Sequence, residues 1–340
     1  MSLKSSASPN YSRRKAVDAM MRSLVFVATG LAIVPLVLII GYVIVIGGGA
    51  LNWEFFTDIY QPPMTVSMPD LGPVDPNDPF ANLDLGSLVG GEPGTGQEGA
   101  NDEKGADILE APARGGVFHG IVGTLLITTV ALIIATPIGI MAGIFLSEFP
   151  DNSVATTVRF ASDVLSGAPS IIVGVTAYIL IVNAKGADGQ PLGFAGIAGS
   201  IALTFLMVPT ITRTTEEVLK LVPEATREAA LAMGATTWYS TFTVVIPTAL
   251  SGIVTGVMLA FARGAGETAP LIMTVLGSNV LMTNLFEPMA ALPLITYRYT
   301  ESPFPSENTL AWGSAFVLMM LVLLVNILVR IATRNRLRMR

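Results

Sequence analysis

The chain has 340 residues, of which 51% are hydrophobic and only 13% are charged. Soluble globular domains carry roughly 25% charged residues, so this composition indicates a protein whose solvent is largely lipid. Cysteine is absent and His119 is the single histidine, which excludes disulfides, thiol nucleophiles and histidine-based or thiolate metal sites. No stretch combines basic and aromatic residues in the manner of a nucleic-acid-binding surface.

Six apolar stretches approach the length of about 20 residues that a helix needs to cross a bilayer. In chain order they are residues 23–46, 120–146, 160–182, 195–211, 247–276 and 310–332. The first is too long for the apolar part of a cleaved signal peptide, so we interpret it as a retained membrane anchor. The sequence therefore predicts an all-α polytopic membrane protein with about six transmembrane helices.

Basic residues are distributed unevenly between the two sides of these predicted spans. One side holds both chain ends, residues 1–22 and 333–340, and carries most of the lysines and arginines. The other side has only Lys104, Arg114, Lys185 and Arg298. Because cytoplasmic segments are enriched in Lys and Arg, both termini are predicted to be cytoplasmic.

The segment 47–118, between the first two predicted spans, is then expected to lie outside. It is rich in Pro, Gly, Asp and Glu and lacks helical or strand periodicity, apart from a short helix expected near residues 53–60. Its acidic residues are the main source of the net charge of −6, so its field would repel a free anion. We expect a long solvated loop, with docking of an external partner as the alternative role.

The most specific pattern lies in the segment 213–246, between the fourth and fifth predicted spans. It contains Glu228-Ala229-Ala230, then Gly234, and then Val-x-Ile before Pro247. Gly234 suits a tight turn between two short helices, and the small alanines permit close approach of another helix. The segment is too charged to enter lipid, so we expect it to pack against something at the membrane surface.

This spacing resembles the EAA loop of ABC importer permeases, which has Glu-Ala-Ala, three residues, Gly, nine residues and Ile-x-Leu-Pro. The resemblance implies an ABC type I importer permease fold, in which this cytoplasmic loop is a coupling helix seated in a cleft of an ATPase. Glu228, Ala229, Ala230 and Gly234 would then transmit closure of the ATPase to the membrane helices. An ordinary amphipathic connection is the alternative. The chain has no Gly-x-x-x-x-Gly-Lys-Ser/Thr pattern, so we expect no cofactor on it and ATP with Mg²⁺ on a separate ATPase.

The fifth predicted span contains two charged residues, Arg263 and Glu267. An Arg within a spanning helix costs about 2.5–3.5 kcal/mol on insertion scales, so such a residue usually faces an aqueous path and has a partner. Residues four apart share a helix face, so Arg263 and Glu267 are expected to pair. Because a guanidinium binds oxyanions bidentately, we interpret Arg263 as part of an anion path, with a structural ion pair as the alternative. For Glu267 we favour the structural ion pair over a direct part in the anion path.

The third predicted span contains Gly167 and Pro169 near its start, which are expected to break or kink the helix. Such a break is typical of a helix at a transport path, although a packing kink explains it equally well. Ser170, directly after the proline, would offer a hydroxyl to a passing anion.

The segment Arg263-x-x-Gly-Glu-Thr-Ala-Pro270 is also similar to the signature of permeases from the phosphate-specific transport (Pst) system. The segment 167–174 in the third predicted span and the last span look like that family too, and the last span favours its A-type subunits. This resemblance, over about residues 115–334, implies a phosphate-importing permease subunit in a prokaryotic plasma membrane, without an enzymatic site of its own. It implies a C-type permease partner, two copies of the ATPase and an external phosphate-binding protein. Arg263, Glu267 and Thr268 would line the pathway.

Two alternatives stay open at this point. A permease for another oxyanion, such as molybdate or sulfate, would share the EAA loop but not the segment 263–270. A secondary transporter would predict inverted repeats and unpaired acidic residues at mid-membrane, and no clear repeat is present. The sequence thus divides into a cytoplasmic tail (1–22), a first transmembrane helix (23–46), an external loop (47–118), a permease domain (119–332) and a second tail (333–340).

Overall fold

A computed structural model of the chain describes residues 11–61, 114–186 and 189–337. Within these residues, five helices are long and apolar enough to cross a membrane, or six if one sharply bent pair counts as a single span. The only strands in the described part form one antiparallel pair, β1 (Ile59–Gln61) with β2 (Arg114–Val117). The predicted class, a polytopic helical membrane protein, is confirmed.

The long helices are α1 (Tyr11–Tyr42), α5 (Phe118–Glu148), α8 (Gly196–Lys220), α11 (Ile246–Ala265) and α14 (Pro305–Leu337). Shorter helices connect them: α2 (Trp53–Thr57), α6 (Ser153–Gly167), α7 (Ser170–Ala177), α9 (Glu224–Ala232), α10 (Thr237–Ser240), α12 (Ala269–Thr274) and α13 (Leu292–Thr300). The described chain also has three π-helical turns. The turn η1 (Val43–Gly47) follows α1, η2 (Tyr178–Val182) follows α7, and η3 (Thr241–Val245) precedes α11.

The body is built around the contact between α5 and α8, the most extensive between any two elements of the described chain. Small residues allow this close approach: a Cβ added to Gly143 would lie 2.6 Å from the Cβ of Thr215. Polar side chains reinforce the contact, since the hydroxyl of Ser200 donates to the carbonyl oxygen of Ile127 at 3.0 Å. Small residues and interhelical hydroxyl bonds are the usual means of helix association where lipid removes the hydrophobic driving force.

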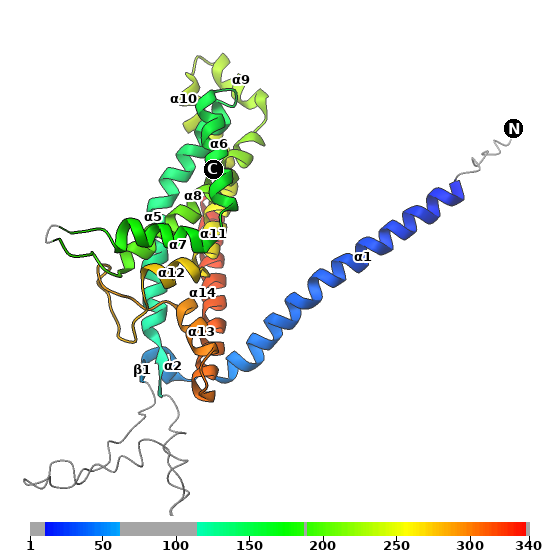
Figure 1. Cartoon of the computed structure of the whole chain (residues 1–340). Helices are drawn as coiled ribbons and strands as arrows, with labels where there is room; N and C mark the ends of the chain where they lie inside the picture. The colour runs from blue at the N-terminus through cyan, green and yellow to red at the C-terminus, as the bar shows by residue number, and fades with distance from the viewer. Residues whose placement is uncertain (1–10, 62–113, 187–188, 338–340) are drawn as a thin grey trace, which may run out of the picture.

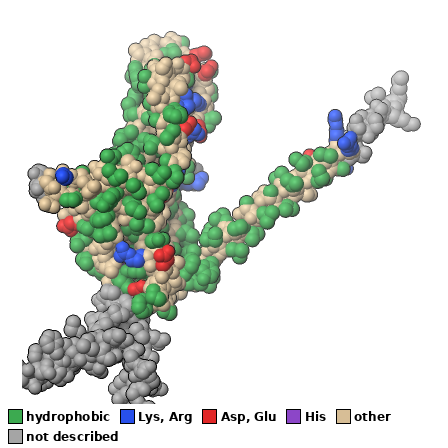
Figure 2. Space-filling model, viewed as in Figure 1, with side chains coloured by type: hydrophobic (Ala, Val, Ile, Leu, Met, Phe, Trp, Pro, Cys, Tyr) green, Lys and Arg blue, Asp and Glu red, His purple; other side chains and the backbone are tan. Residues whose placement is uncertain are grey.

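Helix α1 stands away from this body (Figure 1). None of its most apolar stretch is buried, and hydrophobic side chains cover its length, with basic ones near its N-terminal end (Figure 2). It joins the body through η1, where a Cβ added to Gly47 would lie 2.5 Å from the carbonyl oxygen of Trp312 in α14. An apolar helix with so little of its surface packed is suited to lipid or to another membrane protein.

The third predicted span, 160–182, is not one helix. Helices α6 and α7 are bent by 102° relative to each other, because Ala168 and Pro169 both adopt extended backbone angles. Proline cannot donate a helical hydrogen bond, and it disfavours helical geometry in the residue before it. The expected break at Gly167 and Pro169 is confirmed, and the helix before it, α6, begins at Ser153, earlier than the apolar stretch.

The predicted limits of the fourth and fifth spans also differ from the structure. Helix α8 continues to Lys220, beyond the apolar stretch that ends at residue 211, because its polar last turns are ion-paired. Helix α11 ends at Ala265, and α12 begins only at Ala269, so the predicted span 247–276 is interrupted. Gly266 and Pro270 flank this interruption, in keeping with the preference of Gly for helix ends and of Pro for helix starts.

The two ends of the body carry different structures (Figure 1). One end, which we call the hairpin end, has α2, β1 and β2; the opposite end, the α9 end, has α9 and α10. The helix expected near residues 53–60 is α2, which begins after Asn52, whose side chain accepts from the amide of Phe55 at 2.7 Å. The two short strands beside it were not expected. Most of the predicted loop 47–118, the last three residues of the tail 333–340 and the first ten of the tail 1–22 lie outside the described residues.

Candidate functional site

Arg263 and Glu267 lie where α11 ends. The Nε atom of Arg263 is 3.5 Å from Oε1 of Glu267, so the predicted pairing is confirmed. The Arg263 side chain is 44% exposed and that of Glu267 is 16% exposed. A long, partly exposed ion pair of this kind contributes only about 0–1 kcal/mol, so the guanidinium can exchange its partner at little cost.

Ser170 and this ion pair belong to neighbouring segments of the structure. Ser170 is the first residue of α7, and α7 packs against α12, the helix that follows Glu267. The contact is close because a Cβ added to Gly174 would lie 2.7 Å from the Cα of Pro270. The helix after the break between α6 and α7 therefore packs on the helix after the break between α11 and α12. Within the described chain, no hydrogen bond joins Ser170 to Arg263.

Thr268 lines an open cavity of about 530 Å³ beside the end of α11. The cavity lies among α11, α13 and α14, and its lining also includes Ala262, Gly266, Thr296, Tyr297 and Met319. The Thr296 hydroxyl oxygen is buried and has no hydrogen-bond partner among the described residues. The lining is mainly apolar, with hydroxyl groups from Thr268, Thr296 and Tyr297, and it does not include Arg263 or Glu267.

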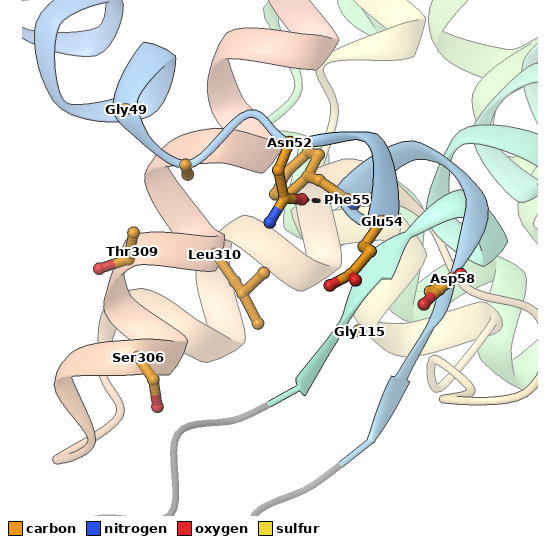
Figure 3. A pocket seen from close by; sticks show the side chains of 10 residues that line it. Gly49, Asn52, Glu54, Phe55, Asp58, Gly115, Ser306, Thr309 and Leu310 are labelled. Atoms are coloured by element: carbon orange, nitrogen blue, oxygen red, sulfur yellow. Dashed lines mark hydrogen bonds between the residues drawn. The ribbon is translucent and has the colours of Figure 1, made fainter.

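A second cavity, of about 640 Å³, lies at the hairpin end (Figure 3). Glu54 and Asp58 from the α2 region line one side of it, and Ser306, Thr309 and Leu310 from α14 line another. Asn52 also lies here, but its side-chain oxygen already accepts from Phe55. Because the charged groups in this lining are carboxylates, an anion is disfavoured here.

The EAA-like segment forms α9, a turn and α10 at the α9 end. Gly234 adopts a left-handed backbone with φ of +86°, which confirms the predicted tight turn after α9. Glu228 and Ala229 are exposed, Ala230 is partly buried, and no residue of α9 is fully buried. Apolar side chains around the turn are exposed as well, including Leu231 at 44% and Met233 at 88%. Exposed apolar side chains of this kind are typical of a surface that binds another protein.

Sequence reasoning missed a set of ion pairs between α6 and α8. Glu216, whose side chain is only 8% exposed, accepts from Arg159 at 2.8 Å and from Lys220 at 2.6 Å. One turn away along both helices, Arg213 pairs with Asp163. The helical spacing of the charges, four residues from Arg159 to Asp163 and three from Arg213 to Glu216, was the available signal, but it could not show which helix lies opposite. These pairs hold α6 against α8.

No group of three or more His, Cys, Asp or Glu residues in the described chain is arranged to hold a metal ion. The side chain of His119, at the start of α5, is buried, and neither ring nitrogen has a hydrogen-bond partner among the described residues. The Arg263–Glu267 pair and the α9 segment therefore carry the candidate functions.

Residues 135–338 match the family described as binding-protein-dependent transport system inner membrane component. The phosphate transport system permease protein PstA of Xylella fastidiosa (strain Temecula1) is 41% identical over 215 residues, 63% of this chain and 73% of that protein. The PstA protein of Yersinia pestis is 43% identical over 220 residues, 64% and 72% of the two chains.

Among solved structures, a chain of the inward-facing MetNI methionine ABC transporter is similar, with a TM-score of 0.50 and 24% identity. The match covers 64% of this chain and 94% of that one, and it shows the fold. The match over residues 135–338 spans more than half of the chain, and the PstA proteins are matched over more than two thirds of their length. The chain therefore belongs to the family of binding-protein-dependent transport inner membrane components, and within it to the PstA-like ABC permeases.

Proposed function

We propose that this chain is the A-type permease subunit of an ATP-driven importer of inorganic phosphate. It would act with a C-type permease partner, two copies of a separate cytoplasmic ATPase that bind ATP and Mg²⁺, and an external phosphate-binding protein. The relatives named as phosphate transport permeases support the substrate. The family description supports both the binding protein and the location in the inner membrane.

The loose Arg263–Glu267 pair is the observation that carries this proposal. A half-exposed guanidinium at the end of an apolar helix offers several donors to an oxyanion, and its present partner is only weakly held. An anion path requires binding that is favourable enough for entry and weak enough for release. Exchange of Glu267 for a phosphate oxygen meets both conditions. Thr268 and Ser170 would contribute hydroxyls from the adjoining segments.

The α9 segment supports the ATPase partner. Its exposed Glu228 and Ala229, with Gly234 at the turn, give α9 the form of a short helix docked on another protein rather than on this chain. Because the ATPase is cytoplasmic, docking of α9 on it would place the α9 end in the cytoplasm and the hairpin end outside. The basic residues at the N-terminal end of α1 and at the C-terminal end of α14 support cytoplasmic termini.

The test is uptake of radiolabelled phosphate at low external concentration, in cells that lack this chain but retain its partners. Wild type should restore uptake, and Arg263→Gln should lower it at least about ten-fold, the effect of losing about 1.4 kcal/mol of anion stabilisation. Lys185→Gln is the matched control, because it removes an exposed positive charge outside the long helices. Membrane abundance must be equal in all strains.

Failure of wild type to restore phosphate uptake would remove phosphate as the substrate. Restoration that is abolished equally by excess sulfate or molybdate would replace phosphate by a broader class of oxyanion. Equal uptake by wild type and Arg263→Gln would return Arg263 to a structural role, and uptake that persists without ATP would contradict the ATPase partner.

A further inference from the structure

Helix α9 is attached to the rest of the chain by little apolar packing. None of its residues is buried, and its main neighbours are α10 and η3, which follow it directly in sequence. Burial of apolar side chains is what ordinarily fixes a short helix in place. Another contact must therefore link α9 to the long helices of the body.

Arg227 makes this link with two separate elements. Its guanidinium forms an ion pair with Glu148, the last residue of α5, and its Nη2 atom donates to the carbonyl oxygen of Leu219 at 2.9 Å. Leu219 belongs to the last turn of α8. One side chain of α9 thus joins the ends of the two helices that share the most extensive contact in the described chain.

The pair between Arg227 and Glu148 is shielded from solvent. The side chains are 22% and 8% exposed, respectively, in contrast to the largely exposed pair of Arg22 and Asp18 in α1, with 70% and 69%. Separating a shielded pair leaves a carboxylate without water and without a partner, so the contact resists displacement. A force on α9 is therefore passed on to α5 before the pair opens.

The same end of α5 has a second contact with this region. The ring of Phe149, directly after α5, lies 6.1 Å from that of Trp238 in α10, and Trp238 in turn stacks on Phe242 in η3. The ion pair from α9 and the aromatic contact from α10 therefore meet at residues 148–149. The buried Val222 and Val245, which precede α9 and follow α10, share a hydrophobic cluster with Ile144 of α5, so residues 148–149 add the contact made by α9 and α10 themselves.

We infer that Arg227 and Glu148 are positioning residues that make the end of α5 the entry point of ATPase movement into the membrane domain. Neither residue touches the anion. When the ATPase moves α9, the Arg227–Glu148 pair moves the end of α5, and α8 follows through Leu219 and its packing on α5. This inference rests on the proposed function, because it takes α9 as the docking site of an ATPase.

The first experiment measures transport and ATP hydrolysis together in proteoliposomes that contain the complete complex. Glu148→Gln keeps the shape of the side chain but removes its charge; it should lower phosphate uptake at least about five-fold while ATP hydrolysis stays within about two-fold of wild type. The charge exchange Glu148→Arg with Arg227→Glu should recover part of the uptake. Asp18→Asn, which removes a carboxylate from an exposed pair, is the control and should change neither rate.

A proportional loss of uptake and hydrolysis would assign the pair a merely structural role and overturn the inference. Unchanged uptake in Glu148→Gln, or a charge exchange that recovers nothing although the complex assembles, would overturn it too. More ATP hydrolysed per phosphate transported, reversed by the charge exchange, would support it.

A second experiment does not depend on the transported anion. The chain has no cysteine, so spin labels can be placed at Glu224→Cys in α9 and Asp151→Cys after α5, two exposed positions, and their distance measured in the complex. The distance should be the same with and without ATP in the otherwise wild-type chain, and should broaden with ATP when Glu148→Gln is added. A change of distance in the wild-type background would overturn the inference. If wild type transports no phosphate, the proposed substrate fails while this measurement still decides the inference.

Discussion

The hairpin end and the α9 end of the body are fixed by different kinds of contact. At the hairpin end, Phe55 is 1% exposed and Tyr60 and Tyr299 are each 5% exposed, with the two tyrosine rings 4.8 Å apart. The hydroxyl of Tyr60 donates to Glu307 in α14. At the α9 end, no residue of α9 is buried, and the ion pair of Arg227 supplies the link to the body.

Because of this difference, we expect substitutions at the two ends to affect different properties, stability at the hairpin end and transport at the α9 end. The hairpin end belongs to a hydrophobic core, so a change there should lower the free energy of unfolding. At the α9 end, the buried cluster of Ile144, Val222 and Val245 excludes α9 itself, whose residues are not buried, so a change in α9 or in the turn after it should affect transport first. Each prediction below tests this contrast, in order of decreasing expected effect on stability.

The largest expected effect is on Phe55. Phe55→Ala should lower the free energy of unfolding by about 3–5 kcal/mol, because it removes a fully buried ring and leaves a cavity against α14. Unfolding in detergent, followed by circular dichroism against denaturant, measures the loss. The matched variant is Trp238→Ala, an aromatic side chain of α10 that is 51% exposed, which should lose less than half as much. Equal losses would contradict the contrast between the two ends.

A smaller effect is expected from the hydroxyl of Tyr60. Tyr60→Phe should cost about 1.5–3 kcal/mol, since it removes a hydrogen bond to a carboxylate. Burial, together with the hydrogen bond to Glu307, raises the pKa of Tyr60 above the usual range for tyrosine. A raised pKa in the folded state contributes stability below the unfolded value of about 10 and loses it as the pH rises further.

The same unfolding measurement, repeated from pH 7 to 11, checks this linkage. The difference between wild type and Tyr60→Phe should be constant up to about pH 9 and shrink above about pH 10, where the unfolded tyrosine ionises. A difference that grows with pH would show that Tyr60 is not held in its neutral form.

The smallest effect on stability is expected at Gly234. With φ of +86° and nothing within 4 Å of an added Cβ, Gly234→Ala should cost only about 1 kcal/mol, through the left-handed backbone alone. Because the strain falls on the turn after α9, phosphate uptake should nevertheless drop severalfold at unchanged membrane abundance. Gly30→Ala is the control: it also has open space around it, but lies within helix α1. Uptake equal to wild type in Gly234→Ala would remove the turn from the coupling role.

Much of the fold could be predicted from the sequence, because apolar length alone marks a spanning helix. The limits of the spans could not be predicted where polar residues continue a helix, as at Lys220, or where glycine and proline interrupt an apolar stretch, as between Ala265 and Ala269. Hydropathy measures the preference for lipid, whereas helix continuity depends on backbone hydrogen bonds. Polar residues can keep these hydrogen bonds, whereas proline removes one of them even in an apolar stretch.

Of the candidate site, the pairs that are close in sequence could be predicted, and those that join distant segments could not. Arg263 and Glu267 are four residues apart, so helical spacing predicts their contact, although Glu267 lies just beyond the end of α11. Arg227 and Glu148 are 79 positions apart, and their contact depends on how the chain brings α9 to the end of α5. A charged residue at the end of an apolar stretch shows that a partner is needed, but not which one.

The bend between α6 and α7 has a consequence for the solvent around it. Because α7 turns away from α6 by 102°, the last carbonyl groups of α6 have no amide of a following helical turn to accept from. Lipid acyl chains offer no hydrogen-bond donor in its place. Water or another protein must supply the missing donors. The segment 167–169 therefore marks a part of the surface from which lipid is excluded, so a lipid-attached fluorescence quencher would identify it by failing to reach it.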